Sequence, residues 1–196
     1  MARRRSQNRK LRTLIVIFTE GVTEKIYFGK LSQKYKRKIK IETIHDGNQG
    51  LNAVEEAEKT LGNSKNLKFK DSQIEQVYLI FDKDHLSLQN LREAKKEADR
   101  LDYKIGFSNE SFELWILSHF QCVTKKHDNK ELKQEISKQI NRKYDDRTKT
   151  DDQLISSLVE DIDRALKNTS SFSKELVLDE NPYTNLGWLI KEIYEL

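Results

Sequence analysis

The sequence contains a single cysteine, a single proline and no long apolar run among its 196 residues. The lone Cys122 cannot form an internal disulfide, and few cysteines are typical of proteins in a reducing compartment. No apolar stretch approaches the roughly 20 residues of a membrane-spanning helix, and the N-terminus lacks the apolar segment of a signal peptide. We therefore expect a cytoplasmic protein without membrane contact.

The charges of the chain are unevenly distributed. Charged residues make up 35% of the sequence and the formal net charge is +4. Six basic residues lie within the first twelve positions, so the remainder carries a net charge of −2. A basic tail can neutralise the phosphates of DNA or RNA, although a role in solubility alone is the alternative. The predicted nucleic-acid-binding residues of this tail are Arg3, Arg4, Arg5, Arg9, Lys10 and Arg12.

The most informative stretch is VYLIFDKDH, residues 77–85, in which an apolar run leads into two aspartates. Such a run predicts a strand buried on both faces, as in a parallel sheet covered by helices. Asp82 and Asp84 then stand at its carboxyl edge with one residue between them, so both side chains can face one crevice. Two carboxylates held this close favour a hard cation. Turn formation by aspartate is the alternative.

A second buried strand is predicted over residues 11–19, and it ends at Glu20. Gly21 follows, and the apolar spacing from Val22 to about Tyr35 predicts an amphipathic helix. This order places the Glu20 carboxylate beside backbone donors at the positive end of a helix. Capping of that helix is the alternative role for Glu20.

Strands and helices alternate through the first half of the chain, which predicts βαβ units in a mainly parallel α/β sheet. From residue 125 the composition becomes highly charged, with thin apolar stripes typical of helices. We expect three parts within one folded unit: a basic tail at 1–12, an α/β core at 13–122, and a helical region at 123–196 packed on the core.

If the strands that end at Glu20 and Asp82 are neighbours, Glu20, Asp82 and Asp84 meet at one edge of the sheet. Oxygen ligands of this kind suit Mg²⁺, with Mn²⁺ as an alternative, and an open face leaves room for a phosphate oxygen. The ion would polarise a phosphodiester, while a free carboxylate, for which Glu20 is the best candidate, would act as acid or base.

Four segments resemble the signature segments of RloB-like proteins, whose fold belongs to the TOPRIM superfamily. They are EGVTE after the first strand, FDKDH after the third, SNESFELWILSHF from residue 108, and NPYTNLGWLI from residue 181. The resemblance implies a TOPRIM-like sheet in which Glu20 is the acid or base and Asp82 and Asp84 hold magnesium. It further implies phosphodiester chemistry, as in topoisomerases, primases and OLD-type nucleases, and a role in phage defence beside an ATPase partner. Glu110 departs from the family pattern, which usually has proline there.

The third segment contributes further candidates. Glu113 is assigned a catalytic role because it lies near a helix start that can face the same crevice. Asn109 either joins the site or fixes the turn through its side chain. His119 lies farther along the same helix, which Ser111 can cap.

Three residues near the two acidic motifs have open roles. Lys83 contacts phosphate or faces solvent, and His85 binds phosphate, moves protons or caps the next helix. For Glu24, favourable electrostatics at the helix start is the main interpretation, with support of the site as the second.

The predicted function is metal-dependent cleavage of DNA or RNA by an effector of prokaryotic phage defence. The sequence contains no Walker motif, so ATP hydrolysis would require a partner protein. One alternative is a phosphatase with Asp82 as nucleophile. The other is a non-catalytic nucleic-acid-binding or sensor subunit that works with a partner ATPase. Self-association is left open.

Overall fold

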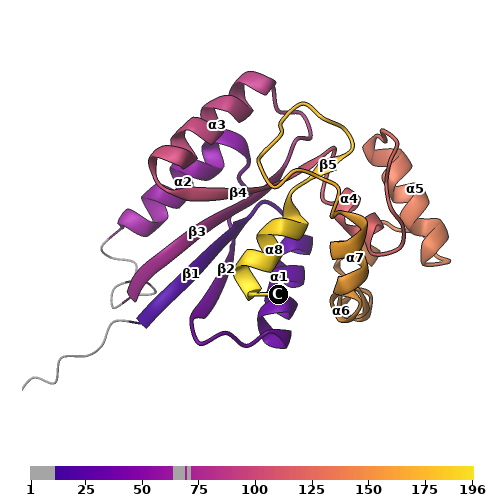
Figure 1. Cartoon of the computed structure of the whole chain (residues 1–196), viewed down its shortest axis with the longest axis horizontal. Helices are drawn as coiled ribbons and strands as arrows, with labels where there is room; N and C mark the ends of the chain where they lie inside the picture. Colours follow the sequence, from indigo (N-terminus) through magenta and orange to yellow (C-terminus); the bar gives the residue numbers. More distant parts are fainter. Residues whose placement is uncertain (1–11, 64–68, 70–71) are drawn as a thin grey trace, which may run out of the picture.

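Figure 1 shows a computed structural model of the chain, which describes residues 12–63, 69 and 72–196. A five-stranded sheet with the order β2-β1-β3-β4-β5 lies at its centre. The first four strands are parallel, and β5 is antiparallel to β4. The strands are β1 Arg12–Thr19, β2 Lys40–His45, β3 Ser72–Asp82, β4 Tyr103–Asn109 and β5 Tyr183–Thr184. The helices are α1 Val22–Lys34, α2 Gly50–Gly62, α3 Leu88–Arg100, α4 Glu113–Ser118, α5 Asn129–Gln139, η1 Thr148–Thr150, α6 Asp152–Glu160, α7 Ile162–Asn168 and α8 Leu186–Tyr194.

Helices cover both faces of the sheet because the side chains of its central strands alternate between two apolar cores. On β1, Ile15 and Ile17 join the core shared with α1 and with α4 to α8. Val16 and Phe18 join the opposite core with α2 and α3. Figure 1 shows α2 and α3 together on one side of the sheet and α1 with α8 on the other. Burial of both faces explains the unbroken apolar runs.

Successive strands are added to the sheet first on one side of β1 and then on the other, so their order reverses there. From β1 the chain passes through α1 to β2 on one side, and then returns through α2 to β3 on the other side of β1. In open α/β sheets, the crevice at the carboxyl ends of the two strands that flank such a reversal is the usual place for a ligand. Here these ends are Thr19, followed by Glu20, and Asp82.

The C-terminal segment returns to the sheet and closes its β4 edge. The side chain of Asn185 accepts a hydrogen bond from the Phe107 amide and donates one to the Ile105 carbonyl, both at 2.8 Å. The hydroxyls of Ser108 and Thr184 lie 3.0 Å apart and share another hydrogen bond. Residues near the end of the chain therefore complete the hydrogen bonding of β4.

The predicted α/β fold with a mainly parallel sheet and helices in the C-terminal half is confirmed. The short strand β5 was not predicted. The apolar stripe over residues 154–166 forms two helices, α6 and α7, which meet at Asp161. No helix in the described ranges has the length and apolar character needed to cross a membrane.

Candidate active site

Five carboxylates line one cavity of about 500 Å³ at the carboxyl edge of β1 and β3. They are Glu20, Glu24, Asp82, Asp84 and Glu113. The other lining residues are Gly21, Val22, Thr23, Ser111, Phe112, Asn129, Lys133, Lys149 and Thr150. The cavity therefore brings together the four acidic candidates of the first two motifs, the acidic candidate of the third, and a set of residues from the helical region.

Glu20 and Asp82 are tied to each other and to the backbone around them. Glu20 Oε2 accepts a hydrogen bond from the Asp82 amide at 3.2 Å, and the Glu20 amide donates to the Ile80 carbonyl at 3.0 Å. Asp82 Oδ2 accepts from the Phe112 amide at 2.8 Å. The parallel pairing of β1 and β3 thus fixes two carboxylates, while the segment before α4 orients one of them.

Asp84 and Glu113 reach the same cavity from the two segments that follow β3 and β4. Asp84 has a positive φ of 35°, a conformation that aspartate tolerates better than most residues, and its amide donates to the Glu110 carbonyl at 3.2 Å. The backbone turns at this point, so the Asp84 side chain can face the cavity. Glu113 is the first residue of α4, where a carboxylate suits the positive end of the helix.

Glu24 is the most deeply buried glutamate of the site, with only 6% of its surface exposed. Burial, followed by the charges of Glu113 and Glu20, raises its pKa to about 7. A Cβ atom at residue 21 would lie 2.2 Å from Glu24 Oε2, so a larger residue there would displace this carboxylate. Glu24 is therefore a member of the acidic cavity in addition to being a first-turn residue of α1.

The crowding of carboxylates also affects the other members of the site. Burial and the charges of Glu24, Glu20 and Glu113 raise the pKa of Asp82 well above its ordinary value. Burial is also the main cause of the raised pKa of Glu20, against the lowering effect of its hydrogen bond from the Asp82 amide. Cations or protons are needed to hold these groups together, because like charges in a low-dielectric site repel one another.

The donor set suits a hard cation, although it does not enclose one. Across residues 12–63, 69 and 72–196, no group of three or more His, Cys, Asp or Glu side chains is arranged to hold a metal ion by itself. Mg²⁺ usually binds through one or two carboxylates, several waters and substrate phosphates, and does not require a complete protein cage. Glu20, Asp82 and Asp84 therefore fit this ion through the chemistry and crowding of their oxygens.

Two lysines of the helical region face the carboxylates across the cavity. Lys133 lies on α5, one turn after Asn129, and Lys149 lies in η1. Burial lowers the pKa of Lys149, but the ion pair with Asp146 and the field of the nearby glutamates outweigh this effect and raise it. The Lys149 amino group is therefore cationic at neutral pH.

Four predicted site residues do not line the cavity. Asn109 is buried, and its Nδ2 donates to the Glu180 carbonyl at 2.6 Å, which ties β4 to the segment before β5. His119 lies in the core, 1% exposed, where its Nε2 shares a hydrogen bond of 3.0 Å with the Tyr27 hydroxyl. The amide of Lys83 donates to the Ser108 carbonyl at 3.0 Å. The side chain of His85 is 95% exposed.

Two helix caps that the sequence allows do not form. Ser87, rather than His85, caps α3, and its hydroxyl accepts from the Asn90 amide. Phe112 occupies the N-cap position of α4, and the Ser111 hydroxyl makes no cap hydrogen bond. Of the predicted tail residues, Arg3, Arg4, Arg5, Arg9 and Lys10 lie outside the described residues, and Arg12 is the first residue of β1.

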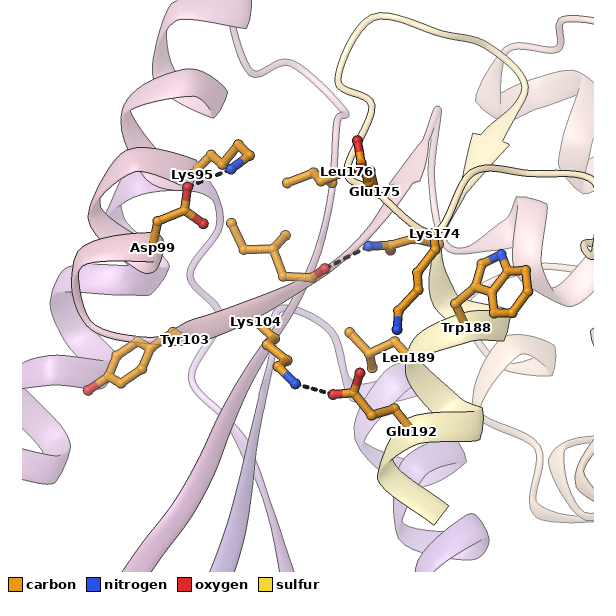
Figure 2. A pocket seen from close by; sticks show the side chains of 12 residues that line it. Lys95, Asp99, Tyr103, Lys104, Lys174, Glu175, Leu176, Trp188, Leu189 and Glu192 are labelled. Carbon is orange, nitrogen blue, oxygen red and sulfur yellow. Dashed lines mark hydrogen bonds and ion pairs between the residues drawn. The ribbon is translucent and has the colours of Figure 1, made fainter. Parts of the chain in front are cut away.

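A second cavity of similar size lies at the β4 edge, between α3, the segment 174–176 and α8 (Figure 2). Its charged residues are largely paired with one another, as in the ion pairs of Lys104 with Glu192 and of Lys95 with Asp99. Of the predicted site residues that the structure describes, none lines it. The acidic cavity is therefore the better candidate for chemistry.

The range matched in the family comparison covers all four signature segments. A family model described as RloB-like protein matches residues 15–193. The chain belongs to the RloB-like protein family. No curated protein and no solved structure matches it. The matched range contains every residue that lines the acidic cavity.

Sequence reasoning missed the cavity residues of the helical region. Asn129 and Lys133 have the i, i+4 spacing of one helix face, but nothing in the sequence indicates that this face meets the carboxylates. Lys149 and Thr150 lie in a charged segment that reads as a solvated loop. Their placement depends on how α5 and α6 pack, which single-sequence patterns do not reveal.

Proposed function

We propose that this RloB-like protein is a metal-dependent nuclease that cleaves phosphodiester bonds in DNA or RNA. The observation that carries the proposal is the meeting of Glu20, Asp82 and Asp84 in one cavity at the carboxyl ends of two adjacent parallel strands. This position is the usual ligand crevice of an open α/β sheet. The raised pKa of Asp82, caused by burial and by neighbouring carboxylates, supports the need for a cation there.

Each residue has a separate task in this reaction. Asp82 and Asp84 would hold Mg²⁺ or Mn²⁺, which would supply positive charge against the negative charge that develops on the phosphate in the transition state. Water attacks phosphorus as the bond to the leaving oxygen breaks, and Glu20 takes the proton released by the water. The Phe112 amide holds Asp82 in place through a hydrogen bond. Glu113 adds a further carboxylate to the lining of the cavity.

Cleavage assays with matched variants test this function. Wild-type protein is incubated with single-stranded DNA, duplex DNA and tRNA in Mg²⁺ or Mn²⁺, with a chelator as the metal-free condition. We expect Asp82→Asn and Glu20→Gln to lose cleavage by at least about 100-fold, as expected for loss of a charged group that acts in the transition state. The exposed carboxylates in Asp163→Asn and Glu55→Gln serve as controls. Wild-type activity that persists in Asp82→Asn would contradict the proposal.

The biological setting is proposed from the resemblance of the four signature segments to the RloB-like family. We place the protein in the cytoplasm as an effector of phage defence with a TOPRIM-type site and a partner ATPase. Cleavage assays with and without that ATPase distinguish this from the alternative of a non-catalytic sensor subunit. A sensor would bind nucleic acid or the partner without cleaving in either condition.

A further inference from the structure

Two lysines of the helical region, Lys133 and Lys149, line the acidic cavity and are called its basic wall. Lys133 on α5 is half-buried. The hydrogen bond and the charge of Lys149 lower the pKa of Asp146, and the charge of Lys133 lowers it further. Lys149 in η1 is 34% exposed, and its Nζ lies 3.0 Å from the carboxylate of Asp146, which is itself 91% exposed. Both lysines line the same cavity as the carboxylates. An ion pair this exposed contributes little stability, so Lys149 can exchange Asp146 for another anion.

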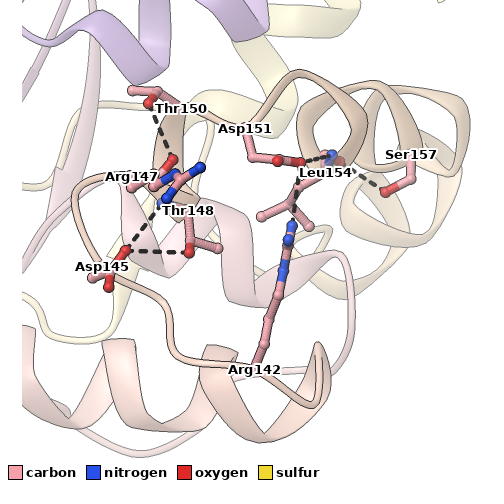
Figure 3. A network of polar contacts seen from close by, with 8 residues as sticks. All are labelled: Arg142, Asp145, Arg147, Thr148, Thr150, Asp151, Leu154 and Ser157. Atoms are coloured by element: carbon pink, nitrogen blue, oxygen red, sulfur yellow. Dashed lines mark hydrogen bonds and ion pairs between the residues drawn. The ribbon is translucent and has the colours of Figure 1, made fainter.

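Figure 3 shows a network of polar contacts among residues on both sides of Lys149 in the chain. The carboxylate of Asp145 accepts hydrogen bonds from the Thr148 amide at 3.1 Å and from its hydroxyl at 3.2 Å. The Asp145 carbonyl accepts from the Lys149 amide at 2.8 Å. Arg142 pairs with Asp151 at 3.2 Å, and Asp151 caps α6. Contacts of the residues before and after Lys149 thus fix the turn that carries it.

The basic wall is also anchored to α1, the helix that carries Glu24. Lys30 forms an ion pair of 2.6 Å with Asp152, and Lys34 donates to the Val159 carbonyl at 2.9 Å. These contacts join the first and the last turn of α6 to α1. The lysines and the carboxylates therefore belong to one packed unit, and their separation is set by the fold.

Two polar atoms at the cavity lack partners. Ser111 is only 5% exposed, and its Oγ makes no hydrogen bond; Asn129 Oδ1 is likewise buried and unpaired. Buried polar atoms in native proteins are nearly always paired, and an unpaired one costs roughly 1–3 kcal/mol. The Ser111 hydroxyl can donate to an oxygen of a bound anion, which would remove this cost.

We propose that Lys133 and Lys149, with Ser111, form the phosphate-binding side of the cavity and hold the substrate backbone against the carboxylates. This inference rests on the proposed nuclease function and assigns it a substrate-binding surface. A phosphodiester would be repelled by five carboxylates, so a site of this composition needs cations on its other side. Lysine serves this purpose as a point charge that tolerates different phosphate orientations.

Binding measurements on the full chain test the inference. The probe is a fluorescein-labelled single-stranded oligonucleotide of mixed sequence, as DNA and as RNA, with Ca²⁺ in place of Mg²⁺ and over a range of salt concentrations. We expect Lys133→Met and Lys149→Met each to weaken binding by about tenfold and to reduce the salt dependence of log K by about one. Lys133→Arg and Lys149→Arg should retain binding within about threefold, because the charge remains.

The controls separate the lysines from metal binding and from general charge. Lys130→Met lies on the exposed side of α5, and Lys143→Met lies in the segment before η1. Both should bind as wild type does, and all four methionine variants should keep the Mn²⁺-dependent thermal shift. If Lys133→Met and Lys149→Met bind like these controls while the wild type still cleaves, the inference is wrong and the nuclease proposal stands. If the wild type neither cleaves nor binds, both are wrong.

Discussion

The Asp82 amide donates a hydrogen bond of 3.2 Å to Glu20 Oε2. The carboxylate that follows β1 is therefore bound to the backbone at the end of β3. This contact ties together two motifs that are 62 residues apart in the chain. It also lowers the pKa of Glu20, against the larger raising effect of burial and the further effects of Asp84, Asp46 and Glu113. Positive charge near Glu20 would therefore favour its ionised form.

The first prediction concerns metal binding. Mg²⁺ or Mn²⁺ should raise the melting temperature of the wild type, and Asp82→Asn should abolish the effect. A ligand that binds only the native state stabilises it by about 2.7 kcal/mol at a hundredfold excess over Kd. Because protons compete for the same carboxylates, the shift should be larger at pH 8 than at pH 6. Asp163→Asn is the control, and an equal shift in Asp82→Asn would place the ion elsewhere.

The second prediction concerns the buried charge of Glu24. Its pKa is about 7 in the folded protein and 4.5 in the unfolded reference, so the folded state binds the proton more tightly. This contribution to stability is complete below pH 4.5 and is lost as the pH rises through about 7. Without divalent metal, Glu24→Gln should therefore be more stable than the wild type at pH 8, by up to about 3 kcal/mol.

Urea denaturation in chelator at pH 5 and pH 8 measures this difference. The gain in Glu24→Gln should be small at pH 5, where the wild-type carboxyl is protonated. The exposed Glu55→Gln should match the wild type at both values. A gain of equal size at both pH values would mean that removal of the charge is not its cause.

Much of the site follows from local sequence patterns. The runs before Glu20 and Asp82 are apolar because both faces of β1 and β3 are buried. Such unbroken apolar runs can be recognised in the sequence without a structure. Once the two strands are neighbours, the geometry of a parallel sheet brings their carboxyl ends to one edge. The convergence of Glu20 with Asp82 could therefore be predicted on the condition that the two strands are neighbours.

The remaining part of the site depends on packing between distant segments. Glu24 was assigned mainly to the electrostatics of a helix start, yet the absence of a Cβ at Gly21 lets its side chain enter the cavity. Asn185 satisfies backbone groups of β4 from 78 residues away along the chain. Contacts between segments so far apart in the chain leave no periodic signal in the sequence. The position of Lys133 beside the carboxylates also depends on such contacts, so it was missed.

The third prediction assigns His119 to stability instead of catalysis. Burial lowers the pKa of His119 to about 3, below the value of 6.5 for an exposed histidine. The folded state therefore binds the proton less tightly, and stability falls as the pH drops below 6.5. In His119→Phe, this loss between pH 6.5 and pH 5 should be smaller than in the wild type by about 2 kcal/mol.

The control for this histidine is His85→Phe, because the His85 side chain is 95% exposed. At pH 7, His119→Phe should lose roughly 1–3 kcal/mol, since the buried Tyr27 hydroxyl is left without its partner. Urea denaturation measures both effects. A pH dependence of stability in His119→Phe identical to that of wild type would contradict a neutral, buried histidine.

The last prediction concerns the closure of the sheet by Asn185. Its side chain is 6% exposed and pairs with the Phe107 amide and the Ile105 carbonyl. Asn185→Ala leaves both backbone groups unpaired at a buried position, so we expect a loss of roughly 2–4 kcal/mol in the free energy of unfolding. Asn52→Ala, on the exposed side of α2, should change stability little or raise it slightly. Because Asn185 lies away from the acidic cavity, the folded variant should keep the wild-type response to Mn²⁺. A loss below about 0.5 kcal/mol would mean that water replaces both contacts and that β4 does not depend on the C-terminal segment.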